Sequence, residues 1–215
     1  TAPAHLIGEW PSAIFRVRNP TIETMINAAS RWHRTPRLRH ILAALVLACS
    51  LAPSARADGG TWIAAALGSG ENIDVLRIGG GFRPCSCDWL ASIGATPFAG
   101  VHVEYWNARG DRHPNDNSWN VGAVFGPRWS LAPQSVLQPF IELGLGGLAV
   151  TETRIGTRNL STALLFDERL AAGIALDPAA RYQLAVYAEH RSNGRIKTPN
   201  DGLTTYGLEL RIALH

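Results

Sequence analysis

A histidine and a serine two residues apart have the side chains that ester hydrolysis requires. They lie near the C-terminus in segment 187–206, which reads YAEHRSNGRIKTPNDGLTTY. A serine hydroxyl becomes a nucleophile when a neighbouring base removes its proton, and histidine is a common base. Ser192 and His190 are therefore a candidate nucleophile and base. The amides of Asn193 and Asn200 are candidate donors to the oxygen that gains negative charge.

The candidate pair shares the apolar face of an expected strand, 181–193. Successive side chains of a strand point to opposite faces, so His190 and Ser192 stand on the same side as the apolar residues before them. Glu189 and Arg191 stand on the opposite side. Taken alone, this spacing is more often a polar girdle at the end of a strand than a catalytic pair. The elements that hold the pair decide between the two interpretations.

Residues 58–215 show almost no helical period and many short alternating segments, joined by stretches rich in Gly, Pro, Asn and Asp. The pattern predicts an all-β domain. The expected strands are 62–68, 74–82, 97–107, 118–131, 136–150, 162–176, 181–193 and 204–214.

The face that carries the charge distinguishes a membrane barrel from a soluble one. The side opposite the apolar face carries Glu189 and Arg191 in one strand and Glu209 and Arg211 in the last. Strands of about 10 residues with an apolar exterior and a polar, packed lumen are typical of outer-membrane barrels. The sequence therefore predicts an eight-stranded antiparallel transmembrane β-barrel of the bacterial outer membrane. A soluble lipocalin-like barrel, with inside and outside reversed, is the alternative.

An export signal precedes the expected barrel. A basic segment, 31–39, is followed by the apolar run 41–51 and by the small-residue motif Ala-Arg-Ala at 55–57. The run has 11 residues, whereas a membrane-spanning helix needs about 20. We expect a secretory signal peptide that is cleaved before Asp58. A transmembrane anchor and a lipoprotein site at Cys49 are the alternatives.

This leader also accounts for the basic character of the chain. The 215 residues have a formal net charge of +3. Residues 1–57 hold seven of the 20 Lys and Arg and two of the 17 Asp and Glu, which leaves 13 bases, 15 acids and a net charge of −2 in residues 58–215. We interpret residues 1–57 as an N-terminal extension with the signal peptide, and residues 58–215 as the barrel domain. Nucleic acid is not an expected partner.

Two further groups of polar residues carry no predicted chemistry. Cys85 and Cys87 lie in a turn-like segment, where a disulfide across one residue is awkward and a lone C-x-C lacks the other ligands of a zinc site. Asp111, His113 and Asp116 are metal-ligand types within a Pro- and Asn-rich stretch, which we interpret as a solvated extracellular loop. No metal and no cofactor are expected.

The motif around the candidate pair belongs to a longer pattern. H-R-S-N is followed by K-T-P-N-D-G-L, and QPFIELGLGG (138–147), TRIGTRNLSTALLFDERLAAGI (153–174) and the closing YGLELRI accompany it in order. Together these segments resemble the PagL-type outer-membrane lipid A 3-O-deacylases over essentially all of residues 58–215. The resemblance implies a serine esterase that removes the ester-linked 3-position acyl chain of lipid A. Its partners would be lipid A or lipopolysaccharide and other outer-membrane lipids.

The resemblance also implies a role for each matching residue. Ser192 matches the nucleophile, and His190 matches the general base that later protonates the leaving alcohol. Asn200, with Asn193 or a nearby backbone amide, would hold the oxyanion. Phe166 matches an aromatic residue of the acyl-chain groove, and a lipid-facing barrel residue is an equal interpretation.

One position departs from the family pattern, because Thr204 stands where the family has an acidic residue. By strand parity Thr204 shares the outer face with His190 and can accept a proton from it, but it supplies no charge. Glu189 and Glu209 should point into the lumen, and Asp201 reaches the site only if its turn folds back. A weakened or inactive barrel that binds lipid or is structural is therefore the alternative function. The oligomeric state, a homodimer included, is left open.

Overall fold

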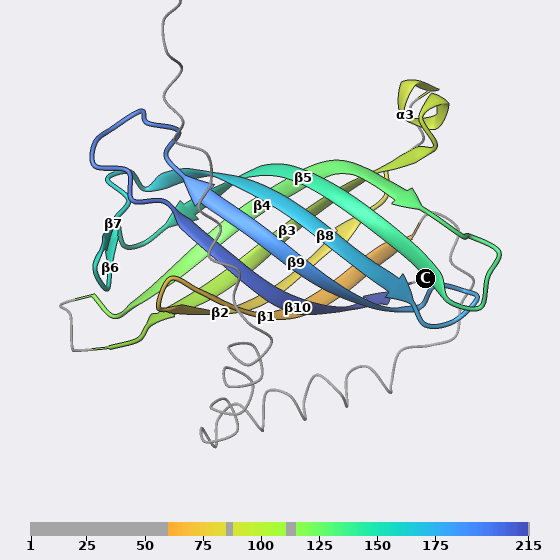
Figure 1. Ribbon diagram of the computed structural model, residues 1–215, viewed down its shortest axis with the longest axis horizontal. Helices are drawn as coiled ribbons and strands as arrows, with labels where there is room; N and C mark the ends of the chain where they lie inside the picture. The colour runs from red at the N-terminus through yellow and green to blue at the C-terminus, as the bar shows by residue number, and fades with distance from the viewer. Residues whose placement is uncertain (1–59, 85–87, 111–114, 215) are drawn as a thin grey trace, which may run out of the picture. The chain divides into compact units, whose positions relative to one another are not determined.

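Antiparallel strands close into a barrel, as Figure 1 shows. The computed structural model describes residues 60–84, 88–110 and 115–214. In these residues the barrel strands are β1 (Thr61–Gly70), β2 (Ile73–Phe82), β3 (Ala95–Ala108), β4 (Asn117–Ser130), β5 (Gln138–Val150), β8 (Leu164–Ala175), β9 (Tyr182–Ser192) and β10 (Leu203–Ala213).

All eight expected strands are present, each within two residues of its expected ends. Their order around the barrel is β1-β10-β9-β8-β5-β4-β3-β2, and β1 also pairs with β2. The predicted eight-stranded antiparallel barrel is therefore confirmed. Several expectations concern residues outside the described ones: the leader in residues 1–57 with Cys49, the pair Cys85 and Cys87, and the loop residues Asp111 and His113.

Three short elements were not expected from the sequence. A single helical turn, α3 (Asp88–Ser92), precedes β3, and a hairpin of β6 (Arg154–Ile155) and β7 (Arg158–Asn159) lies in the connection between β5 and β8. Elements this short give no periodic signal in a sequence. Within the described residues, no helix is long and apolar enough to cross a membrane.

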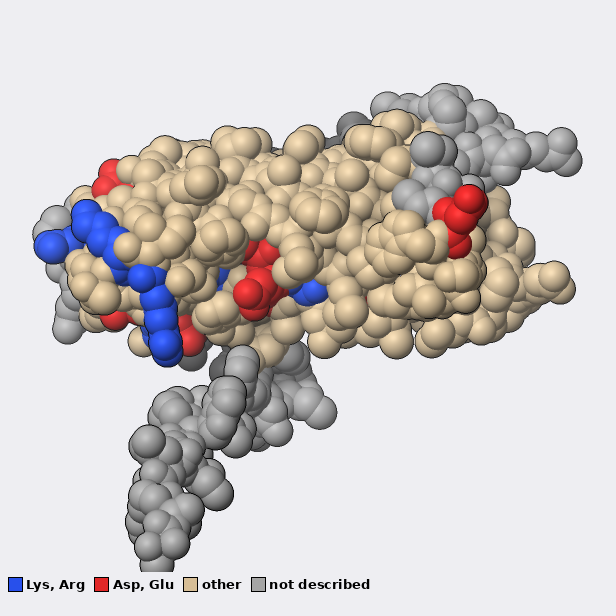
Figure 2. All heavy atoms as spheres, turned by 90° about the horizontal axis from the view of Figure 1, so that it is seen from above, with Lys and Arg blue, Asp and Glu red and all other residues tan. Residues whose placement is uncertain are grey.

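The two faces of the barrel wall differ as charge parity predicted. Most outer side chains are apolar and exposed, including Val101, Phe125 and Leu145, which are 64%, 64% and 60% exposed. Figure 2 shows such uncharged residues over most of one side of the barrel. Glu189 and Arg191, which point inward, are 1% and 0% exposed. An apolar exterior around a charged interior fits an outer-membrane barrel and is the reverse of a soluble one.

Paired charges fill the middle of the lumen. Arg77 donates from Nε to Glu104 at 2.7 Å and from Nη1 to Glu189 at 2.6 Å. Arg169 donates to the same Glu189 oxygen at 2.6 Å, and Arg191 donates to Glu104 at 2.9 Å. Each carboxylate therefore faces more than one guanidinium, as the interior of a small barrel requires if buried charge is to be tolerated.

An apolar layer closes one end of the lumen. Trp106, Leu148, Ile155, Leu160 and Leu203 are completely buried and belong to one cluster. They come from the ends of strands and from the connections that include β6 and β7, at the end opposite the C-terminus (Figure 1). We call this the loop end of the barrel. Side chains therefore fill the lumen at this end.

Candidate active site

His190 lies on the outer face of β9, between strands β8 and β10. The register places Thr204 of β10 beside it on one side and Glu168 of β8 on the other. Its ring nitrogen Nδ1 is 2.9 Å from the Thr204 hydroxyl oxygen. The imidazole is exposed on the side that faces lipid. The structure therefore brings together the candidate base and the residue at the acidic position of the family.

Ser192 is the last residue of β9 and lies on the same outer face. It is half-buried and stands opposite Phe166 of β8. The backbone N–H of Gly194 donates to its hydroxyl oxygen at 3.4 Å. Within the described chain no hydrogen bond joins Ser192 to His190, although both side chains stand on one face. Catalytic hydrogen bonds commonly tighten only when substrate is bound.

The side chain of Asn193 points into the connection between β9 and β10. Its side chain is completely buried and donates to the carbonyl oxygens of Leu160 and Lys197 at 2.9 and 2.8 Å. Both side-chain N–H bonds are thereby directed into the loop and away from the outer face. The Asn193 side chain holds the connection between β9 and β10 in place, which strand parity did not reveal because the residue follows the last strand position.

Asn200 is oriented by the backbone. Its Oδ1 accepts a hydrogen bond from the Asn193 N–H at 3.0 Å, which leaves Nδ2 as the donating end of the amide. Asp201, the next residue, is directed elsewhere, because its Oδ2 accepts from the Asn159 N–H at 2.6 Å. The turn therefore does not bring the Asp201 carboxylate to His190. Arg158 of β7 fastens the same turn by donating to the Gly202 carbonyl at 2.9 Å.

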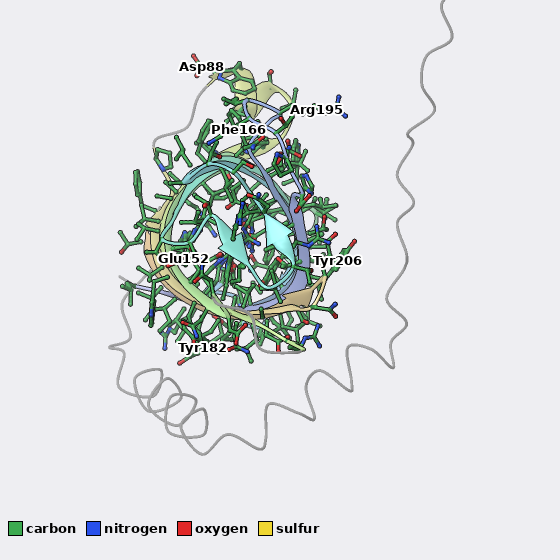
Figure 3. The ribbon with its side chains drawn as sticks, turned by 90° about the vertical axis from the view of Figure 1, so that its left-hand side faces the viewer. Asp88, Glu152, Phe166, Tyr182, Arg195 and Tyr206 are labelled. Atoms are coloured by element: carbon green, nitrogen blue, oxygen red, sulfur yellow. The ribbon has the colours of Figure 1, made fainter. Side chains whose placement is uncertain are left out.

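Phe166 forms the wall beside Ser192. Phe166 is 52% exposed, and in Figure 3 it projects outside the ring of strands, as does Arg195 of the β9–β10 connection. Gly194 has a φ of +61°, and a side chain there would meet the Phe166 ring at 2.8 Å. A glycine is therefore needed both for the turn and for the close approach of this ring.

The family follows from the comparisons with known proteins. Residues 77–213 match the family model described as lipid A 3-O-deacylase (PagL). The chain belongs to this family. It is 32% identical over 154 residues to the lipid A deacylase PagL of Pseudomonas aeruginosa, a match that covers 71% of this chain and 86% of the relative.

The structural comparison agrees with the family assignment. The crystal structure of the outer membrane enzyme PagL matches with a TM-score of 0.61 and 29% sequence identity, over 70% of this chain and 98% of the other. The chain is accordingly an outer-membrane β-barrel of the PagL family. Its resemblance to this family, recognised from the motifs around His190, is confirmed.

Strand alternation determines which of the other carboxylates near His190 and Ser192 in this PagL-family barrel point into the lumen and which point outward. Glu189 and Glu209 lie in the lumen, as predicted, where they pair with Arg77, Arg169 and Arg211. Glu168 is the carboxylate that the sequence reasoning overlooked. The sequence did show a charged residue that interrupts an outward row of apolar residues. Its position beside His190, however, depends on the register between β8 and β9.

A metal site has no support in the described residues. Among them, no three His, Cys, Asp or Glu side chains converge on a site that could hold a metal ion. Two of the loop residues considered from the sequence, Asp111 and His113, lie outside the described part of the chain.

Proposed function

We propose that this barrel hydrolyses the 3-O-linked acyl ester of lipid A. Ser192 Oγ attacks the ester carbonyl carbon while His190 takes the hydroxyl proton. The tetrahedral intermediate then expels the sugar hydroxyl, which receives that proton from His190. Water releases the fatty acid from the acyl-serine in a second, equivalent cycle.

The observation that carries this proposal is the position of the polar group in the barrel wall. His190, Ser192 and Thr204 stand on the lipid-facing side at the loop end, and His190 is hydrogen-bonded to Thr204 at 2.9 Å. The longer connections of such barrels face the cell exterior. An ester at the level of the lipid head groups is therefore within reach of Ser192 without leaving the membrane.

Two donors are available for the oxyanion. The backbone N–H of Gly194 already points at Ser192 Oγ at 3.4 Å. The Nδ2 group of Asn200 is the second, since the Asn193 N–H fixes the orientation of its amide. The Asn193 side chain supports both groups indirectly by holding the loop. Preorganised donors of this kind stabilise charge that develops in the transition state.

Phe166 is proposed as one wall of the acyl-chain groove. It stands directly opposite Ser192, and its half-exposed ring lies against the backbone of Gly194. An acyl chain lying along this ring would present its ester carbonyl to Ser192. The same exposure suits a purely lipid-facing residue, so substrate kinetics decide between the two roles.

The second candidate function is a weakened or inactive barrel that binds lipid or is structural. It is favoured by Thr204, whose hydroxyl shares a hydrogen bond with His190 but carries no negative charge. Loss of the carboxylate from a Ser-His-Asp triad reduces the rate by orders of magnitude and leaves residual chemistry.

The mass of lipid A from expressing cells tests the proposal. Cells that make the wild-type chain should contain lipid A lighter by one 3-position acyl chain, and cells that make Ser192→Ala should not. Comparable amounts of folded barrel in both outer membranes are the control. Unaltered lipid A in wild-type cells would favour the second candidate.

A further inference from the structure

A charged residue interrupts the lipid-facing surface next to the candidate base. The outward residues of β8 are Leu164, Phe166, Glu168 and Leu170, and the two leucines are 68% and 50% exposed. A charge on the lipid face of a barrel is unfavourable to a degree that depends on its depth. An ionisable residue in such a place calls for a functional reason and a named partner.

The register names His190 as that partner. Glu168 and His190 are directly opposite each other on β8 and β9. Side chains opposite each other in adjacent antiparallel strands have Cβ atoms about 4.5–5.5 Å apart. A glutamate side chain spans that distance by rotation. Among the described residues, none forms a hydrogen bond or ion pair with Glu168 that would hold its carboxylate elsewhere.

The other carboxylates close to His190 in sequence are committed to other partners. Glu189 is paired in the lumen with Arg77 and Arg169. Asp201 accepts from the backbone of β7. Glu168 is thus the acidic group that both faces outward and stands in register with the imidazole.

We propose that Glu168 is a positioning residue that supplies the negative charge missing at Thr204. The inference rests on the proposed esterase function. When His190 takes the proton of Ser192, its ring becomes a cation. Thr204 Oγ accepts from Nδ1–H and fixes the ring on the β10 side, while the ionised Glu168 compensates its charge from the β8 side. The proton passes on to the leaving alcohol, and Glu168 stays ionised throughout.

Steady-state kinetics of the purified full-length barrel on lipid A in detergent test this inference. Glu168→Gln should lower kcat about 10- to 100-fold, the effect of removing an opposite charge next to a group that must become charged. KM should change little, because Glu168 acts on His190 and does not touch the substrate. Glu168→Asp should retain most of the activity. Adding Thr204→Glu to Glu168→Gln should restore kcat, because a carboxylate then stands on the other side of the same ring.

Two controls separate this role from folding and from general effects on the lipid face. Leu170→Gln places the same amide two positions further along the outer row of β8 and should leave kcat unchanged. The heat-modifiable mobility of each variant in electrophoresis reports the folded barrel.

The outcomes distinguish this inference from the proposed function. If wild type is active, Ser192→Ala is inactive and Glu168→Gln keeps the wild-type kcat, the inference is wrong and the esterase function stands. A double variant as slow as Glu168→Gln, or a rise in KM without a loss of kcat, also overturns it. A folded but inert wild type overturns both.

Discussion

One strand of this barrel supports two regions with opposite properties. Glu189 and Arg191 of β9 point into the lumen, where they are completely buried and paired with each other and with further charged residues. His190 and Ser192, which alternate with them, point outward. Within the described residues the side chain of each has a single hydrogen bond, between His190 and Thr204 and from the Gly194 N–H to Ser192. The lumen holds many ion pairs and hydrogen bonds, and the outer group has few.

The difference shows what each region is built for. Ions taken out of water destabilise a fold unless they are paired, and ion pairs join the charges of the lumen. The outer polar residues face lipid and gain little from their few hydrogen bonds. Stability therefore accounts for the lumen charges but not for the outer polar residues, for which the proposed hydrolysis of a lipid ester would give a reason.

The two regions are also mechanically connected. Arg191 donates to Thr205 of β10 at 2.8 Å inside the barrel, one residue from the contact between His190 and Thr204 outside it. The same pair of strands is thus fastened on both faces. The lumen network fixes the backbone from which the outer side chains project, as a preorganised site requires.

The largest expected effect is the loss of deacylation when the proposed nucleophile is removed and the lumen is left unchanged. Ser192→Ala should lower deacylation at least about 1,000-fold, as removal of a serine nucleophile does in other hydrolases. The barrel should fold normally, because Ser192 lies outside the wall and takes part in no lumen contact. Lipid A mass and heat-modifiable mobility, measured on the same cells, check both parts. Loss of the folded form in Ser192→Ala would show that the outer group also contributes to folding, and would contradict the distinction between the two regions.

The reverse experiment disturbs the lumen. Glu189→Gln removes a charge shared by Arg77, Arg169 and Arg191, and breaking a buried ion pair on one side costs about 3–5 kcal/mol. The free energy of unfolding, from urea titration in lipid bilayers, should fall by that order.

The matched control for the lumen substitution is Glu71→Gln. It breaks an ion pair with Arg158 at 2.8 Å, in which the side chains are 35% and 25% exposed. Exposed pairs contribute about 0–1 kcal/mol. Equal losses in the two variants would contradict the contrast between a lumen rich in buried ion pairs and an exterior with few contacts.

Most of the barrel could be predicted from the sequence, because the two patterns that define it lie within single strands. Strict alternation gives the strands, and the side that carries Glu189, Arg191, Glu209 and Arg211 gives the lumen. The turn between β1 and β2 fits the same local rules, since Glu71 and Asn72 both have positive φ angles, of 50° and 66°, as two-residue hairpins prefer.

The site was only partly readable, because it depends on relations between strands. Parity put His190, Ser192 and Thr204 on one face, but the pairing of His190 with Glu168 requires the register of β8 on β9. The inward turn of Asn193 depends on carbonyl groups at Leu160 and Lys197, one of them 33 residues away. No periodicity in a single sequence reports such contacts.

A gain of activity would sharpen the view of the outer group as a weakened catalytic site. Thr204→Glu places a carboxylate where the hydroxyl now meets His190 Nδ1. It should fix the imidazole tautomer and stabilise its cationic form, and raise kcat about 10-fold. Thr204→Val, which removes the acceptor, should lower kcat. If neither variant changes kcat, and Ser192→Ala matches wild type, the outer group is not catalytic.

The smallest expected effect concerns Phe166, which is 52% exposed and belongs to the outer row of β8. If its ring lines the acyl-chain groove beside Ser192, Phe166→Leu should raise KM about threefold with little change in kcat, because a hydrophobic contact that is equal in ground and transition states affects binding alone. Leu170→Val, in the same row but further from Ser192, is the matched control and should leave KM unchanged. KM values for lipid A with long and short 3-position chains measure the difference, which should shrink with the shorter chain. An equal KM for wild type and Phe166→Leu on both substrates would make Phe166 a lipid-facing residue like Leu170, and the proposed acyl-chain groove would then not include this ring.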